Sequence, residues 1–103
     1  MIKIVYICSL FSGDVVQNTE NARKYCKYAV SQGVLPIAPH LLFPQFLDDN
    51  CPVEREKGLA FGLILLEKVD ELWVFGTRTS EGMRREIEKA IANEMPIIYI
   101  TDI

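Results

Sequence analysis

The segment TRTSEGMRREIEKA has the clearest potential for chemistry, because it places a serine, a glycine and glutamates at the start of a predicted helix. Ser80 is a good N-cap residue. The free backbone N–H groups that follow it could bind an anion, and Gly82 would let a phosphate come close to the backbone. Glu81 suits the helix dipole in the first turn, and we expect it to face solvent.

Glu86 is the second acid of this segment and lies four residues after Gly82. On a helical wheel it falls at the border of the apolar stripe, roughly 60° from its centre at ~100° per residue. A partly desolvated carboxylate under a loop rim could act as a nucleophile or a base. Pairing with Lys89 or Arg84 on a wet surface is the alternative, which spacing alone favours. The expected stripe consists of Met83, Ile87, Ala90 and Ile91.

Other candidate residues lie earlier in the chain. His40 could contact a base or phosphate, supply a proton, or have only a structural role at the end of a strand. Arg55 could reach a phosphate or pair with Glu54 or Glu56. The LDDN segment, residues 47–50, could face a sugar hydroxyl or a cation, but we favour a cap for the helix that follows.

An alternation of strands and helices must position these side chains. The β-branched and apolar runs predict four strands, at residues 3–8, 34–39, 70–76 and 96–100. Apolar periodicity and cap residues predict helices at 18–33, 52–68 and 80–95, the first capped by Asn18 or Thr19 and closed by Gly33. Ala22, Cys26, Ala29 and Val30 would form the apolar face of the first helix. Continuous apolar strands alternating with helices predict a mainly parallel sheet of four to five strands, covered on both faces.

The carboxyl ends of such strands are where ligands bind in α/β sheets. Cys8 and Ser9 follow the first strand, His40 follows the second, and residues 76–82 follow the third. Three loops therefore converge on one rim, which is the predicted site. Pro36 suggests that the second strand lies at an edge of the sheet.

Composition excludes several classes of protein. The 103 residues fit one domain, residues 1–103, and the net charge of −3, with acids and bases interspersed, argues against binding a nucleic-acid polymer. No signal peptide is recognisable, and the longest apolar run, GLAFGLILL, is too short to span a membrane. Three cysteines at unrelated spacings suit reduced thiols in a cytoplasmic protein, and a single histidine makes a metal site unexpected. The predicted helix at 52–68 becomes apolar almost all round at LAFGLILL, which suggests a core layer plus a subunit contact, hence a homo-oligomer.

Several short motifs together carry a family resemblance. YICSLF, NTENARKYC, PIAPH, VDELWVFG, SEGMRREIEKA and MPIIYI resemble, in order and spacing, the nucleoside 2-deoxyribosyltransferase-like superfamily. That group includes the deoxynucleoside monophosphate N-glycosidases, and the resemblance is closest to a small branch without settled function. It spans nearly the whole chain. It implies a small Rossmann-like or flavodoxin-like three-layer α/β/α sandwich, an oligomer that is often a dimer, and no cofactor.

The resemblance also implies roles for individual residues. A Ser-x-Gly-x-x-x-Glu segment opens the last helix in that family, and Ser80, Gly82 and Glu86 match it. Glu86 would attack the anomeric carbon of a deoxyribose, while Ser80 would hold a 5′-phosphate. Tyr6 would lie next to the sugar and base. Ser9 would also contact substrate, although the family's first loop is usually richer in glycine.

One departure concerns the helix before the third strand. The enzymes of that superfamily carry an aspartate eight residues before the position of Asp70, and this chain has Gly62 there. In those enzymes the aspartate assists departure of the base or contacts hydroxyl groups. We therefore predict a nucleoside- or nucleotide-binding protein that could be an N-glycosidase or a deoxyribosyltransferase. A non-enzymatic nucleotide sensor or sequestering protein using the same pocket is the alternative, and a structural or interaction module is a third.

Overall fold

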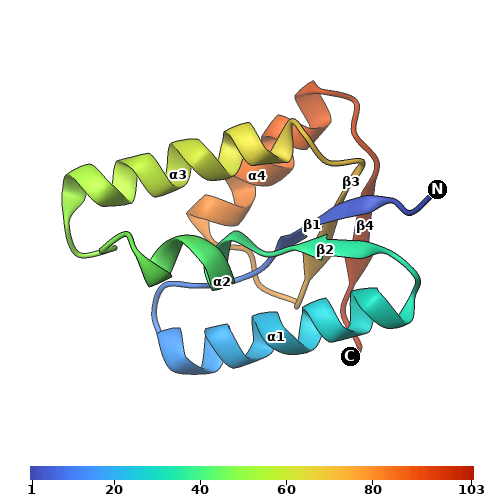
Figure 1. The fold of residues 1–103 in the computed structure, drawn as a ribbon, viewed down its shortest axis with the longest axis horizontal. Coiled ribbons are helices and arrows are strands. Elements are labelled where there is room, and N and C mark those ends of the chain that lie inside the picture. Colours follow the sequence, from blue (N-terminus) through green and yellow to red (C-terminus); the bar gives the residue numbers. More distant parts are fainter.

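Four parallel strands form a single sheet in the computed structural model, which describes residues 1–103 (Figure 1). Their spatial order is β2-β1-β3-β4, so the chain adds strands on both sides of β1. This is the order of the first four strands in flavodoxin-like sheets. The strands are β1 (Ile4–Cys8), β2 (Leu35–Ile37), β3 (Glu71–Phe75) and β4 (Ile97–Ile100).

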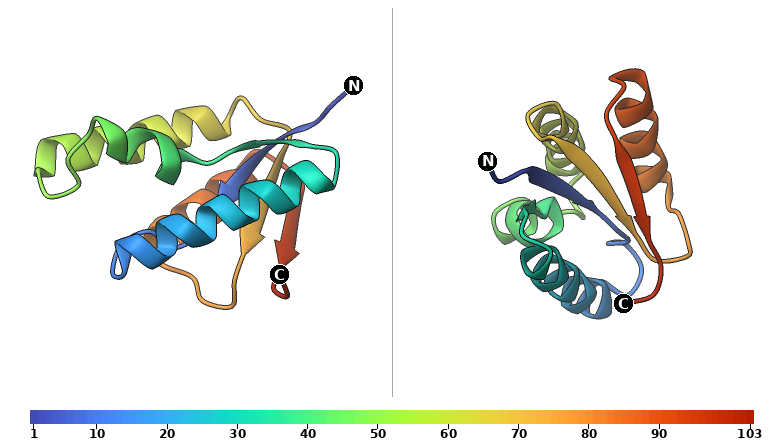
Figure 2. Two further views of the ribbon diagram at one scale, coloured as in Figure 1. Left: turned by 60° about the horizontal axis from the view of Figure 1, so that its bottom comes forward. Right: turned by 90° about the vertical axis from the view of Figure 1, so that its right-hand side faces the viewer.

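Helices cover both faces of this sheet, which confirms the expected three-layer α/β/α sandwich with four strands. The right-hand view of Figure 2 shows α1 on one side of the sheet and α3 and α4 on the other. The short α2 and the 3-10 turn η1 connect β2 to α3. The helices are α1 (Val15–Ser31), α2 (Pro39–Leu42), η1 (Phe43–Gln45), α3 (Pro52–Leu66) and α4 (Glu81–Ala92).

Alternation along the strands divides the core into two layers. In β1, Tyr6 and Cys8 face α3 and α4, whereas Val5 and Ile7 face α1. All four side chains are almost completely buried, as expected for a parallel strand covered on both faces. Tyr6 therefore carries a hydroxyl group into the apolar layer beneath α3 and α4.

Asp70 joins the beginnings of β1 and β3. Its Oδ2 accepts a hydrogen bond from the N–H of Ile4 at 2.8 Å, and its own N–H donates to the Ile4 carbonyl at 2.8 Å. The register that follows pairs Cys8 with Val74, so the carboxyl ends of the two strands lie level. Pro36 lies in the edge strand β2, as predicted.

The helix boundaries and faces differ from prediction in a few places. Helix α1 begins at Val15 and is capped by Asp14, whose side chain accepts a hydrogen bond from Gln17 N, so the predicted cap at Asn18 or Thr19 is wrong. Val30 and Ile91 were expected in apolar stripes, but they are 60% and 62% exposed. Each directly follows a buried alanine, and a rotation of ~100° per residue turns it outward.

The segment at residues 47–50 does not cap α3, contrary to prediction. Asp48 Oδ1 accepts a hydrogen bond from Asn50 N at 2.9 Å, and Cys51, the N-cap residue, provides no side-chain cap. Glu54 of the first turn reaches back instead, and its Oε1 accepts from Asp48 N at 2.6 Å. Pro52 has no N–H, so this helix start has fewer donors to satisfy.

Helix α3 leaves part of its apolar surface uncovered. Phe61 and Ile64 are 41% and 53% exposed, while Gly62 and Leu66 are buried against the sheet. The homo-oligomer inferred from this segment stays a prediction. None of the helices is both long enough and apolar enough to cross a membrane.

Candidate functional site

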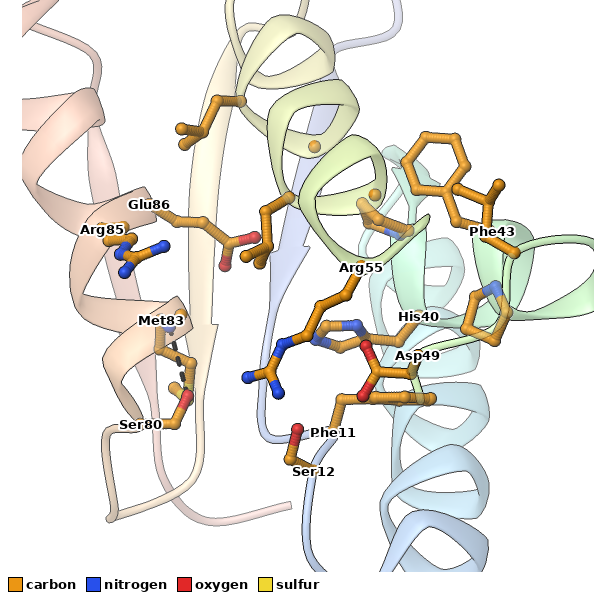
Figure 3. Close-up of a pocket in the computed structure, with 18 of the residues that line it drawn as sticks. Phe11, Ser12, His40, Phe43, Asp49, Arg55, Ser80, Met83, Arg85 and Glu86 are labelled. Atoms are coloured by element: carbon orange, nitrogen blue, oxygen red, sulfur yellow. Dashed lines mark hydrogen bonds between the residues drawn. The ribbon is translucent and has the colours of Figure 1, made fainter. Parts of the chain in front are cut away.

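A pocket of about 460 Å³ lies beyond the carboxyl ends of the strands, between the loop after β1 and helices α2, α3 and α4 (Figure 3). This is the region where the sheet order changes direction around β1, the usual ligand position in α/β folds. The structure brings all the predicted site residues to this one pocket. They are Tyr6, Ser9, His40, Ser80, Gly82 and Glu86.

Glu86 points its carboxyl group into the pocket from the second turn of α4 (Figure 3). The hydroxyl group of Tyr6 donates a hydrogen bond to its Oε2. Its Oε1 is buried and has no hydrogen-bond partner. One oxygen is thus fixed while the other is left for a ligand, because a buried acceptor without a partner is unfavourable.

The alternative of a surface ion pair for Glu86 is wrong. Arg84 pairs with Glu81 at 2.7 Å, and Lys89 pairs with Glu67 of α3 at 2.7 Å. Both predicted partners are therefore engaged elsewhere. Glu81 itself has a side chain that is 65% exposed, which confirms that it faces solvent.

The surroundings of Glu86 favour its protonated form. Burial raises its pKa to about 7, against the smaller opposing effect of the hydrogen bond from Tyr6. Burial also raises the pKa of the Tyr6 hydroxyl, with a further contribution from the Glu86 charge, so Tyr6 stays a donor. Near neutral pH a sizeable fraction of Glu86 is ionised, which suits a nucleophile or a base.

Gly62 makes room for the tyrosine. A Cβ atom at this position of α3 would lie only 3.0 Å from the Tyr6 hydroxyl oxygen. Position 62, where the family resemblance led us to expect an aspartate, thus lies next to the Tyr6 hydroxyl group. A side chain at position 62 and the present Tyr6–Glu86 hydrogen bond therefore compete for space.

His40 and Phe11 form an aromatic wall of the pocket. Their ring centroids are 4.9 Å apart with an interplanar angle of 24°. His40 Nε2 lies 3.0 Å from the carbonyl oxygen of Ser9, and burial lowers the pKa of the imidazole. The neutral ring therefore places its proton on Nε2 and donates it to that carbonyl. The Ser9 hydroxyl is buried, lines the pocket and has no partner.

The start of α4 closes the side of the pocket nearest Glu86. Ser80 caps the helix as predicted, and its Oγ accepts a hydrogen bond from Met83 N at 3.2 Å (Figure 3). Gly82 leaves the helix surface open, since a Cβ there would meet no atom closer than 3.9 Å. This combination keeps N–H groups of the first turn accessible to an anion.

Substitution of Ser80 by alanine tests the cap. Ser80→Ala is expected to lower the free energy of unfolding by about 1 kcal/mol, because Met83 N–H loses its acceptor. Urea denaturation measures this change. Thr79→Ala, at the exposed preceding residue, is the matched control and should change stability by less than about 0.5 kcal/mol. Equal effects of the two substitutions would contradict the capping role.

Arg55 extends from the first turn of α3 into the pocket (Figure 3). It forms no ion pair, so the predicted surface pairing with Glu54 or Glu56 is wrong. The guanidinium group is consequently free to meet an anionic or polar part of a ligand. Arg85 of α4 is the second guanidinium of the lining and lies 3.8 Å from Glu81.

The sequence model of one protein family matches residues 3–100, almost the whole chain, and its description is a domain of unknown function, DUF7768. The chain belongs to the DUF7768 family. No curated protein matches the chain.

Sequence reasoning missed several residues of the DUF7768 pocket. Phe11, Phe43 and Asp49 line it, but no motif singled them out individually. Phe11 had a weak signal, because it is an aromatic residue in the loop at the predicted rim. Phe43 lies with its ring centroid 5.9 Å from that of Phe61 in α3, a contact between distant segments that sequence spacing does not reveal.

Proposed function

We propose that this protein binds a nucleoside or nucleotide in the pocket and cleaves or transfers its N-glycosidic bond through Glu86. The observation that carries the proposal is the Glu86 carboxyl group, held by Tyr6 at one oxygen and unpartnered at the other. A carboxylate used as a glycosyl nucleophile needs a fixed orientation and one oxygen that is free of hydrogen bonds. The family resemblance of the Ser-x-Gly-x-x-x-Glu segment supports the same assignment.

Each wall of the pocket supplies a different part of the recognition. The stacked Phe11 and His40 rings offer a flat apolar surface for a base. The unpartnered Ser9 hydroxyl can bond a sugar hydroxyl group. The backbone N–H of Gly82, together with Ser80, would bind a phosphate when the ligand carries one.

A non-enzymatic role in sensing or sequestering nucleotides is the second candidate. Gly62 favours it, because this position holds no acid that could protonate a departing base. Loss of such a group typically costs 10²–10⁴-fold in rate. The binding pocket would be the same, and only turnover separates the two functions.

Release of free base is the test. The protein is incubated with a panel of nucleosides and their monophosphates, including charged-base analogues, and free base is measured by chromatography. We expect release by the wild type and none above background by Glu86→Ala, because the nucleophile is gone. Equal release by both proteins, or none by either, would refute the enzymatic proposal.

Thermal unfolding with the same panel tests the second candidate. A ligand present at 100 times its Kd should stabilise the protein by about 2.7 kcal/mol. Stabilisation without base release would support sensing or sequestration. A flat response to the whole panel would contradict nucleotide binding of either kind.

A further inference from the structure

We infer that the substrates of this pocket are N-glycosides whose base already carries a positive charge, of the kind exemplified by pyridinium nucleosides. The inference rests on the proposed function and narrows it to one substrate class. Three observations support this inference: apart from Glu86 the pocket has no free general acid, the residues that line it have a negative formal charge, and an aromatic pair forms one wall.

Departure of a neutral base from a sugar requires a proton. When the C1′–N bond breaks, its electron pair stays on the base, and a neutral purine or pyrimidine would leave as an anion. A positioned general acid prevents this and contributes on the order of 10²–10⁴-fold in rate. A pyridinium base takes up the same electron pair and leaves as a neutral molecule.

Apart from Glu86, the buried side chains of this pocket that could act as a general acid are already engaged. Tyr6 donates its hydroxyl proton to Glu86, and burial raises the pKa of the phenol further. His40 is neutral and directs its Nε2 proton to the Ser9 carbonyl. Gly62 fills the position from which α3 would present an acid, and the Tyr6 hydroxyl blocks a side chain there.

The charge of the residues that line the pocket favours a cationic ligand. Five carboxyl groups and two guanidinium groups line the pocket, so their formal charge is negative. Apart from Glu86, these acids lie toward the solvent or accept a hydrogen bond, as Glu54 does from Asp48 N. A flat cationic ring would also bind against the Phe11–His40 aromatic pair more strongly than a neutral ring. The five acids are Asp49, Glu54, Glu56, Glu81 and Glu86.

Cleavage of the C1′–N bond of a cationic base needs no proton from the protein. Ionised Glu86 forms a bond to C1′ through Oε1 while the C1′–N bond breaks, and the bonding pair neutralises the ring nitrogen. Water then attacks C1′ of the glycosyl ester, Glu86 leaves as a carboxylate, and the proton of the water passes to solvent. The products are the free sugar, or sugar phosphate, and the neutral base.

Pairs of a charged and a neutral substrate test the charge requirement. The first pair is 7-methyl-2′-deoxyguanosine and 2′-deoxyguanosine, which differ by one methyl group and a positive charge. The second is nicotinamide riboside and adenosine, and nicotinamide mononucleotide with adenosine monophosphate repeats this comparison with a phosphate. Free base is measured for each compound with the wild type and with Glu86→Ala.

We expect the charged member of each pair to be cleaved on the order of 10²-fold faster or more, with no cleavage by Glu86→Ala. The rate should rise with pH through about 7, as Glu86 ionises, and then stay level. Equal cleavage of a charged base and its neutral counterpart, or a bell-shaped profile in which the rate falls again at higher pH, would overturn this inference and leave the proposed function standing. No cleavage of any compound would overturn both.

Discussion

Replacement of Glu86 by glutamine is expected to abolish the loss of about 3 kcal/mol in the free energy of unfolding that the wild type shows between acid and mildly alkaline pH. The same substitution is expected to end base release. The pKa of this carboxyl group is about 7 in the folded protein, compared with 4.5 as its ordinary value. Between these values the folded chain retains a proton that the unfolded chain has lost. The free energy of unfolding of the wild type therefore decreases as pH rises through this window and is level above it.

Urea denaturation across this pH range measures the effect as the difference between the two proteins. His40 contributes an opposite slope, because burial lowers its pKa, but it does so in both proteins and cancels. Glu88→Gln, on the exposed side of the same helix, is the control and should follow the wild-type curve. If the free energy of unfolding of Glu86→Gln changes with pH in the same way as that of the wild type, the carboxyl group is not buried as described.

Substitution of Gly62 by alanine is expected to destabilise the protein and to raise the pKa of Glu86. An alanine usually stabilises a helix by about 1 kcal/mol relative to glycine. Here the added methyl group would lie 3.0 Å from the hydroxyl oxygen of the fully buried Tyr6, and crowding of this kind costs about 1–3 kcal/mol. Displacing Tyr6 also removes a hydrogen bond that favours the ionised form of Glu86.

Gly58→Ala provides the matched control on the same helix. A Cβ there would meet Leu47 Cδ1 at 3.7 Å, an ordinary contact, so this variant should gain stability. We expect the two variants to differ by about 2 kcal/mol in urea denaturation. The Glu86 pKa, followed by carbon NMR of its labelled carboxyl group, should rise only in Gly62→Ala. Equal stabilisation by both substitutions would show that Tyr6 does not occupy this space.

Much of the fold could be predicted because its signals are local. Short β-branched runs alternating with capped, periodic segments define the layers, and Pro36 identified an edge strand. The errors lie at single positions. Val30 and Ile91 are apolar and adjacent to the buried stripes, but a helix buries a narrow face, and the adjacent residue turns outward.

The site was predictable to the extent that it follows strand ends. Ser9 and His40 were placed by the rule that ligands bind beyond the carboxyl ends of parallel strands, and both line the pocket. The contact between Tyr6 and Glu86 joins residues 80 positions apart, and no spacing rule gives it. The sequence likewise identified Gly62 only as a missing acid, whereas the structure shows it as the space that the tyrosine needs.

Asn18, which was expected to cap α1, has a consequence for ligand affinity. Its amide group donates hydrogen bonds to the carbonyl oxygens of Phe11 at 2.9 Å and Ser12 at 3.2 Å. The loop that carries the aromatic wall is thus tied to a helix before any ligand arrives. Ordering a mobile side chain on binding costs about 0.5–1.5 kcal/mol, and a wall fixed during folding spares the ligand that entropic cost.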